Sequence, residues 1–262
     1  MDLNLKNKVA LITGASKGIG LACAKSLASE GCDLIIVSRN KIEINEVSSE
    51  ISKEYSVKCI ASNGDVSDLN FPRKLFKIIK KEFKKLDILV NNSGGPSPGS
   101  FMFHSETEWN KALNLNLMSV VRFSKEATSL MKINSYGRII NILSMLAKEP
   151  TPNMVLSATA RAGVMAFSKA TSIELGPMGI TINNICPGGV LTDRFNKLLS
   201  IGAKNSNKSE KEYLDERVKT VPVGRFANPN EIGHLVSFLA SPMSSFINGT
   251  NLVIDGGQAK SY

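Results

Sequence analysis

Short apolar stretches alternate with amphipathic stretches along the whole chain. The apolar stretches are rich in Val, Ile and Leu, and several are apolar at almost every position, which is typical of strands buried on both faces. The stretches between them repeat apolar residues every three or four positions, which predicts helices. The expected strands occupy residues 9–13, 33–38, 58–66, 87–92, 137–144, 181–188 and 251–257.

This alternation predicts a single α/β domain over residues 1–262, a doubly wound parallel sheet of about seven strands with helices on both faces. The length of 262 residues and the 42% hydrophobic content are enough to bury a full core. Residues 193–221 differ, because they are polar, rich in Lys and Ser and only partly periodic. Too little chain follows them to form a second domain, so we predict a mobile lid over a binding cleft.

The formal net charge of +9 is concentrated in residues 71–85, where Lys and Arg alternate with Phe76, Ile79 and Phe83 at helical spacing. This predicts an amphipathic helix with a solvated basic face, and a polyanion-binding site is the less favoured alternative. No stretch approaches the roughly 18 apolar residues of a membrane helix, and the first residues do not resemble a signal peptide. We therefore expect a soluble, cytoplasmic protein without nucleic-acid or membrane partners.

The four cysteines are too widely and irregularly spaced to suggest a disulfide framework or a metal site. We expect them to pack as small buried apolar residues, and we expect no bound metal. They are Cys23, Cys32, Cys59 and Cys186.

A glycine-rich turn, "TGASKGIG", follows the first expected strand, with Gly14, Gly18 and Gly20 in the spacing G-x3-G-x-G. Glycines between a strand and a helix let the backbone approach a pyrophosphate, which then lies at the positive end of the helix. A plain tight turn is the alternative. Within the turn we also expect Ser16, Lys17 and Ile19 to contact a dinucleotide cofactor.

The second expected strand ends in Ser38, Arg39 and Asn40 and carries no acidic residue there to bind a ribose 2′-hydroxyl. Asp33 lies at the opposite end of that strand. A guanidinium at this position suits a 2′-phosphate, and Lys17 adds a second cation nearby. We therefore predict NADP(H) as the cofactor rather than NAD(H), with an ordinary surface arginine as the alternative.

Together with further motifs, this turn resembles the short-chain dehydrogenase/reductase family over almost the whole chain. The resemblance implies a Rossmann-like fold, and the general likeness is to 3-oxoacyl-acyl-carrier-protein reductases and to sugar or alcohol dehydrogenases. It also implies a homotetramer that pairs helices around 105–131 and 156–176. The further motifs are "GDVSD" (64–68), "LVNNSGG" (89–95), Asn116 in "LNLNLMSVV", Ser144 in "NILSM", "NNICPGGVLTD" (183–193), "VGRFANPNEIGHLVSFLAS" (223–241) and "INGTNLVIDGG" (247–257).

The resemblance implies further cofactor contacts beyond the glycine turn and Arg39. Asp65 and Val66 fall at the family's adenine-binding positions. The other implied contacts are Asn92, Gly94, Arg161, Pro187, Gly188, Val190 and Thr192.

The family's catalytic set is Asn, Ser, Tyr and Lys, and Asn116 and Ser144 match its first two members. The positions of the tyrosine and the lysine carry Ser157 and Arg161, and the following Ala162 supports this register. A serine hydroxyl is a far weaker acid than a phenol, and an arginine with a pKa of about 12.5 or higher does not act as an acid or base. Because they lie four residues apart on one helix, we expect both to face the cleft, with Arg161 holding the nicotinamide ribose.

Two functions stay open. The first, which we favour, is an NADP(H)-dependent oxidoreductase acting on a small-molecule carbonyl or alcohol, with a water held by Ser157 and Asn116, or a replacement acid, delivering the proton. The second is an NADP(H)-binding protein that has lost reductase catalysis and acts as a sensor or assembly partner. The sequence does not reveal the substrate. Candidates for the replacement acid are His104, Tyr213, and Lys148 with Glu149.

Overall fold

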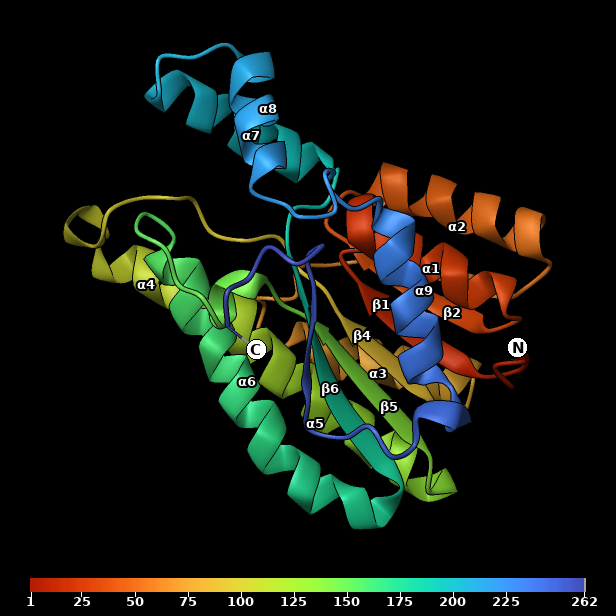
Figure 1. Ribbon diagram of the computed structural model, residues 1–262. Helices are drawn as coiled ribbons and strands as arrows, with labels where there is room; N and C mark the ends of the chain where they lie inside the picture. Colours follow the sequence, from red (N-terminus) through yellow and green to blue (C-terminus); the bar gives the residue numbers. More distant parts are fainter. Residues whose placement is uncertain (262) are drawn as a thin grey trace.

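The computed structural model describes residues 1–261 and contains a seven-stranded sheet in the order β3-β2-β1-β4-β5-β6-β7, with every strand pair parallel (Figure 1). The predicted doubly wound, Rossmann-like sheet in one domain is therefore confirmed. The order reverses between β1 and β4, which creates a topological switch point where such sheets bind ligands. The strands are β1 Val9–Thr13, β2 Asp33–Ser38, β3 Cys59–Asn63, β4 Ile88–Asn91, β5 Gly137–Ile142, β6 Ile180–Pro187 and β7 Asn251–Ile254.

Helices cover both faces of the sheet, and alternate strand residues point to opposite layers. On β1, Ala10 and Ile12 pack in the layer formed by α1, α2 and α9, whereas Val9 and Leu11 pack in the layer of α3 and α5. The α-helices are α1 Gly18–Ser29, α2 Lys41–Tyr55, α3 Phe71–Glu82, α4 Glu106–Leu113, α5 Ser119–Met131, α6 Val155–Leu175, α7 Asp193–Asn205, α8 Glu210–Lys219 and α9 Pro229–Ala240.

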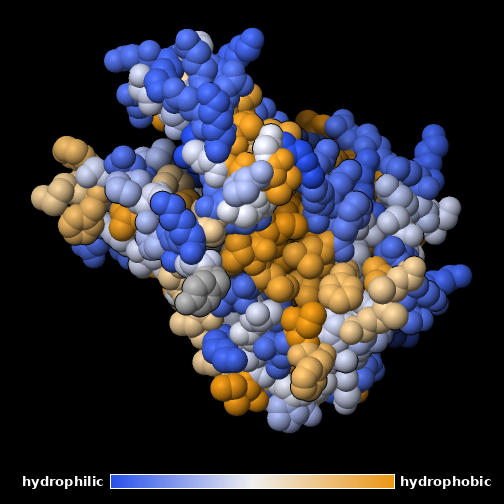
Figure 2. Space-filling view, viewed as in Figure 1, coloured by the Kyte–Doolittle hydropathy of each residue, from blue (hydrophilic) through white to orange (hydrophobic). Residues whose placement is uncertain are grey.

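Two segments that the sequence marked as unusual are helical. The basic stretch forms α3, which buries Leu75, Phe76 and Ile79 and exposes its Lys and Arg side chains, so the predicted amphipathic helix is confirmed. The predicted lid contains α7 and α8, which project from the body of the molecule in Figure 1 and are covered mainly by hydrophilic residues in Figure 2. Its mobility stays a prediction.

All four cysteines are free thiols. Cys23, Cys32 and Cys186 are buried as expected, whereas Cys59 on the outer strand β3 is only half-buried. Burial raises the pKa of Cys23 and Cys32 to about 12 and the pKa of Cys59 and Cys186 to about 11. Because the thiolate is the reactive form, these side chains are poor nucleophiles at neutral pH.

Within residues 1–261, no helix combines the length and the apolar character that crossing a bilayer requires. The same residues contain no group of three or more His, Cys, Asp or Glu side chains placed to hold a metal ion.

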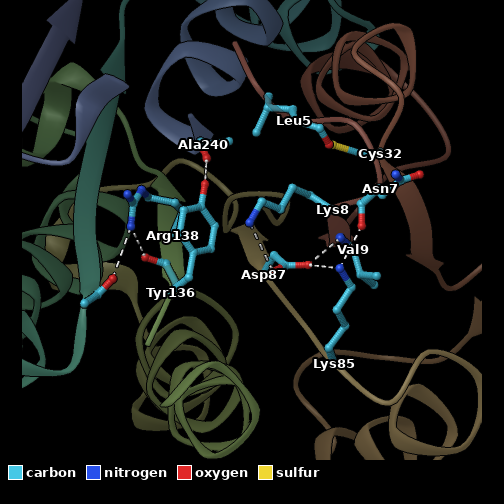
Figure 3. A network of polar contacts seen from close by, with 12 residues as sticks. Leu5, Asn7, Lys8, Val9, Cys32, Lys85, Asp87, Tyr136, Arg138 and Ala240 are labelled. Atoms are coloured by element: carbon cyan, nitrogen blue, oxygen red, sulfur yellow. Dashed lines mark hydrogen bonds and ion pairs between the residues drawn. The ribbon is translucent and has the colours of Figure 1, made fainter. Parts of the chain in front are cut away.

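A buried carboxylate, Asp87, links the amino ends of the central strands (Figure 3). One of its oxygens accepts a hydrogen bond from the backbone N–H of Val9 at 2.8 Å and lies 3.2 Å from the Lys85 ammonium. The other lies 3.7 Å from the ammonium of Lys8, which in turn lies 3.7 Å from the ring centroid of Tyr136. This cluster fastens β1, β4 and β5 together at the edge of the sheet where these strands begin.

Replacing Asp87 by alanine is expected to lower the free energy of unfolding by roughly 3 kcal/mol, because it leaves a buried N–H unpaired and two ammonium groups without their counter-charge. Urea unfolding followed by circular dichroism measures this loss. Glu216→Gln is the matched control, because it breaks an exposed pair with Lys208 and should not shift the unfolding midpoint measurably. An unchanged midpoint for Asp87→Ala would contradict the assignment.

Candidate active site

An open cleft of about 650 Å³ lies at the carboxyl ends of the strands, beside the switch point between β1 and β4. Its walls are the segments that follow strands β1 to β6. Of the predicted cofactor residues, only Gly20 does not line it. Those that do are Gly14, Ser16, Lys17, Gly18, Ile19, Arg39, Asp65, Val66, Asn92, Gly94, Arg161, Pro187, Gly188, Val190 and Thr192.

The glycine turn leads directly into α1. Gly14 and Gly18 have φ angles of +60° and +56°, a region that other residues rarely adopt. Gly20 does not line the cleft, and a Cβ there would lie 2.2 Å from the carbonyl oxygen of Gly14. It lets the helix pack closely against the turn. The first turn of α1 has no acidic residue and no side-chain cap, so its backbone N–H groups suit an anion such as a pyrophosphate.

The two predicted phosphate-binding cations differ in their surroundings. The ammonium of Lys17 lies 3.4 Å from Asp193 and 3.9 Å from Glu43, so two carboxylates already offset part of its charge. Arg39, at the end of β2, is exposed and forms no ion pair with any described residue. Of these two cations, Arg39 is therefore the one whose charge no described carboxylate offsets. Sequence reasoning did not identify Glu43, which also lines the cleft.

Asn116 lies in a π-helical turn, Asn114–Met118, that joins α4 to α5. Its side-chain amide donates to the Ser93 hydroxyl at 2.9 Å and to the Gly94 carbonyl at 2.8 Å. Its carbonyl oxygen is buried and accepts no hydrogen bond from residues 1–261. A second, smaller cavity of about 10 Å³ is lined by Asn116, Ser93 and Arg161 among others. This volume is close to the lower limit for holding one water molecule. Asn116 thus lies behind the wall of the main cleft.

Ser144 follows β5 and lines the cleft, where its hydroxyl accepts a hydrogen bond from the backbone N–H of Leu146 at 3.2 Å. Ser157 and Arg161 lie one turn apart on α6, and the Arg161 guanidinium donates to the Ser157 hydroxyl. Only Arg161 lines the cleft. Ser157 is buried and does not, so the expectation that both side chains face the cleft holds for the arginine alone.

Arg161 is a buried cation, with 7% of its surface exposed and no ion pair among the described residues. Burial, together with repulsion from Arg194, lowers the pKa of Arg161 to about 10, so the group stays charged at neutral pH. Arg194 also lines the cleft and donates to the carbonyl oxygen of Pro96 at 2.8 Å. Sequence reasoning missed Arg194, because nothing in the polar segment 193–221 distinguishes it from a surface residue.

None of the predicted replacement acids lines the cleft. His104 is packed beside Gly99, with its imidazole 3.7 Å from Glu108. Tyr213 packs within the predicted lid. Glu149 accepts hydrogen bonds from the backbone N–H groups of Lys260 and Ser261. Neither Lys148 nor Glu149 lines either of the two cavities described above.

The chain is similar to known reductases in both sequence and structure. The family model described as enoyl-(acyl carrier protein) reductase matches residues 14–259. The NADPH-dependent reductase BacG of Bacillus subtilis is 34% identical over 258 residues, covering 98% of this chain and 100% of that protein. The 3-oxoacyl-[acyl-carrier-protein] reductase FabG of Vibrio cholerae is 34% identical over 260 residues, covering 97% and 98%.

Solved structures of reductases in complex with NADPH are similar to this chain over almost its whole length. The L-sorbose reductase of Gluconobacter frateurii, in complex with NADPH and L-sorbose, superposes with a TM-score of 0.95 at 30% identity and covers 100% of both chains. An actinorhodin polyketide ketoreductase with NADPH gives a TM-score of 0.93 at 29% identity, covering 97% of this chain and 98% of that one.

Proposed function

This chain belongs to the short-chain dehydrogenase/reductase family, and from that premise we propose that it transfers a hydride between NADP(H) and a small carbonyl or alcohol substrate. The observation that carries the proposal is the cleft itself. One wall has the glycine turn and Arg39, which forms no ion pair with a described residue, and another has Ser144 and the Arg161 guanidinium. Such a cleft has both phosphate-binding and carbonyl-binding groups. NADPH dependence in the relatives supports the choice of cofactor.

The residues present fit the cofactor. The N–H groups at the start of α1 and the glycine turn would hold the pyrophosphate, and Arg39 would hold the 2′-phosphate. Asp65 and Val66 would border the adenine, and the segment from Pro187 to Thr192 would border the nicotinamide half. When bound, the nicotinamide supplies or accepts the hydride. The protein aligns the substrate and excludes competing reactions.

We further propose that Arg161 replaces the electrostatic part of the family's tyrosine and lysine. The Ser144 hydroxyl and the guanidinium hold the carbonyl oxygen, and the positive charge stabilises the alkoxide that forms there. Ser157 accepts one guanidinium N–H and so fixes its orientation. The proton comes from a water beside Asn116 and Arg161, which the small polar cavity between them supports. This revises the expected role of Ser157, whose hydroxyl already binds Arg161.

A panel of ketones, 3-oxoacyl thioesters and sugars, assayed with NADPH by absorbance, tests this function. Oxidation of NADPH that depends on a member of the panel supports it. The alternative is an NADP(H)-binding protein without catalysis. It predicts that the wild type is inert and that Ser157→Tyr combined with Arg161→Lys gains turnover.

We expect NADPH to bind at least tenfold more tightly than NADH, since Arg39 gains a charge-assisted contact only with the 2′-phosphate. Arg39→Ala should remove most of this preference. Fluorescence titration measures both dissociation constants. Arg73→Ala, an exposed arginine on α3 away from the cleft, is the matched control and should leave both unchanged. Equal affinities in the wild type would refute the assignment.

We also propose a homotetramer in the cytoplasm. Large apolar side chains exposed on the single chain support assembly, among them Ile173 on α6, Met243 and Phe246. Figure 2 shows apolar surface in the middle of one face, near the β7 edge of the sheet. Four free thiols are consistent with a reducing compartment. Light scattering that gave the mass of one chain would contradict the assembly, and localisation of a tagged chain tests the compartment.

A further inference from the structure

Two guanidiniums meet at one point on the cleft wall. An ideal Cβ placed on Gly95 would lie 2.9 Å from Nη2 of Arg194 and 3.4 Å from Nη2 of Arg161. The two cations therefore flank the same glycine, although one comes from α6 and the other from the start of α7. Because Gly95 has no side chain, the space in front of both groups stays open to the cleft.

The charges of this pair are not compensated within the described part of the chain. Neither arginine forms an ion pair there, and the adjacent carboxylate, Asp193, lies instead against Lys17 at 3.4 Å. Arg194 is held toward Gly95 by its hydrogen bond to the Pro96 carbonyl. Two like charges at one site, one of them buried, are unfavourable until an anion lies between them.

We propose that Arg161 and Arg194 bind a carboxylate of the substrate, so that the protein reduces an oxo acid rather than a neutral carbonyl compound. This inference rests on the proposed function. A guanidinium has five N–H donors in a planar fork, which match the two oxygens of a carboxylate. One Arg161 donor binds Ser157, and the others remain for the substrate. Because Arg161 would face both the carbonyl oxygen and the carboxylate, these groups lie close together in the substrate.

The reaction balances without a further reactant. The carbonyl carbon accepts a hydride from NADPH and the carbonyl oxygen accepts a proton from the water. A proton from bulk solvent converts the resulting hydroxide back to water, so the oxo acid, NADPH and H⁺ give the hydroxy acid and NADP⁺. The carboxylate keeps its charge throughout. Its role is to place the carbonyl group beside Ser144.

The experiment compares short 2-oxo and 3-oxo acids with their methyl esters, using NADPH and the wild type, Arg194→Gln, Arg194→Lys and Arg217→Gln proteins. We expect KM for the best acid to be roughly 10- to 100-fold lower than for its ester in the wild type. A hydrogen bond between charged groups changes binding affinity by about this factor. Arg194→Gln should remove the difference, and Arg194→Lys should restore part of it. Arg217→Gln changes an exposed arginine of α8 outside the cleft and should behave as wild type.

A second measurement does not need turnover. Butanoate, which has no carbonyl group to reduce, should bind the protein–NADPH complex and change the NADPH fluorescence, whereas methyl butanoate should not. Arg194→Gln should abolish the butanoate response. The NADPH dissociation constant of each variant is measured in the same titration.

The outcomes separate the two proposals. If no acid or ester is reduced, and no ketone, 3-oxoacyl thioester or sugar of the panel is reduced either, the proposed function fails, and the butanoate titration still decides the carboxylate site. If the wild type reduces esters with the same KM as the matching acids, the carboxylate site is refuted and the proposed function stands. If Arg194→Gln weakens NADPH binding tenfold without altering the acid preference, Arg194 binds the cofactor and the inference is overturned.

Discussion

Replacing Arg161 by methionine is expected to lower kcat by about 10²- to 10³-fold, the size of effect seen when one group that stabilises a developing oxyanion is removed. Methionine fills much of the same buried volume but carries no charge. Steady-state assays with NADPH give kcat and KM separately. The loss should appear with a neutral ester as well as with an oxo acid, because the alkoxide forms on both.

The control for this variant is Arg161→Lys, which keeps a positive charge and should retain part of the lost rate. Thermal unfolding of each variant establishes that it is folded, since Ser157 loses its hydrogen-bond partner in the methionine protein. A kcat within threefold of wild type for a folded Arg161→Met protein would contradict the role assigned to the guanidinium.

Adding a single methyl group at Gly20 is expected to weaken NADPH binding by roughly 100-fold or more, equivalent to about 2.7 kcal/mol. A Cβ there would lie 2.2 Å from the Gly14 carbonyl oxygen and 2.7 Å from the Asn92 amide nitrogen, so the glycine turn must move away from α1. That movement disturbs the N–H groups that face the pyrophosphate. Fluorescence titration of Gly20→Ala with NADPH measures the effect.

Gly176→Ala is the matched control, because its nearest neighbour, the Asn248 side chain, would lie at an ordinary 3.4 Å. Gly176 lies outside the cleft, and this variant should keep wild-type affinity and stability. If Gly20→Ala binds NADPH as tightly as the control does, the close approach of turn and helix is not needed for the site.

The strands could be predicted closely because each is an apolar run between turn signals. β1 and β2 have the predicted limits, 9–13 and 33–38. The third strand is shorter than predicted, since it ends at Asn63 and the following residues leave the sheet to line the cleft. Periodicity shows where apolar residues are buried, and it does not show where a strand leaves its neighbours.

The side chains of the site were less predictable. The spacing of Ser157 and Arg161 placed them correctly on one helix, but it could not show that the long guanidinium would turn back and cover the hydroxyl. The role of Arg194 could not be predicted either, because its guanidinium lies beside Gly95, which is far from it in the sequence. In residues 193–221, low hydrophobicity left no apolar periodicity from which α8 could be predicted. A capping box of Ser209 and Glu212 marks the start of this helix.

The Asp87 cluster lies where the central strands begin, whereas the cleft lies where they end. Mutations in the cluster would therefore lower the fraction of molecules that stay folded at raised temperature. The kcat of each molecule that remains folded would be unchanged. Resistance to heat and catalytic chemistry therefore depend on residues at opposite edges of the same sheet.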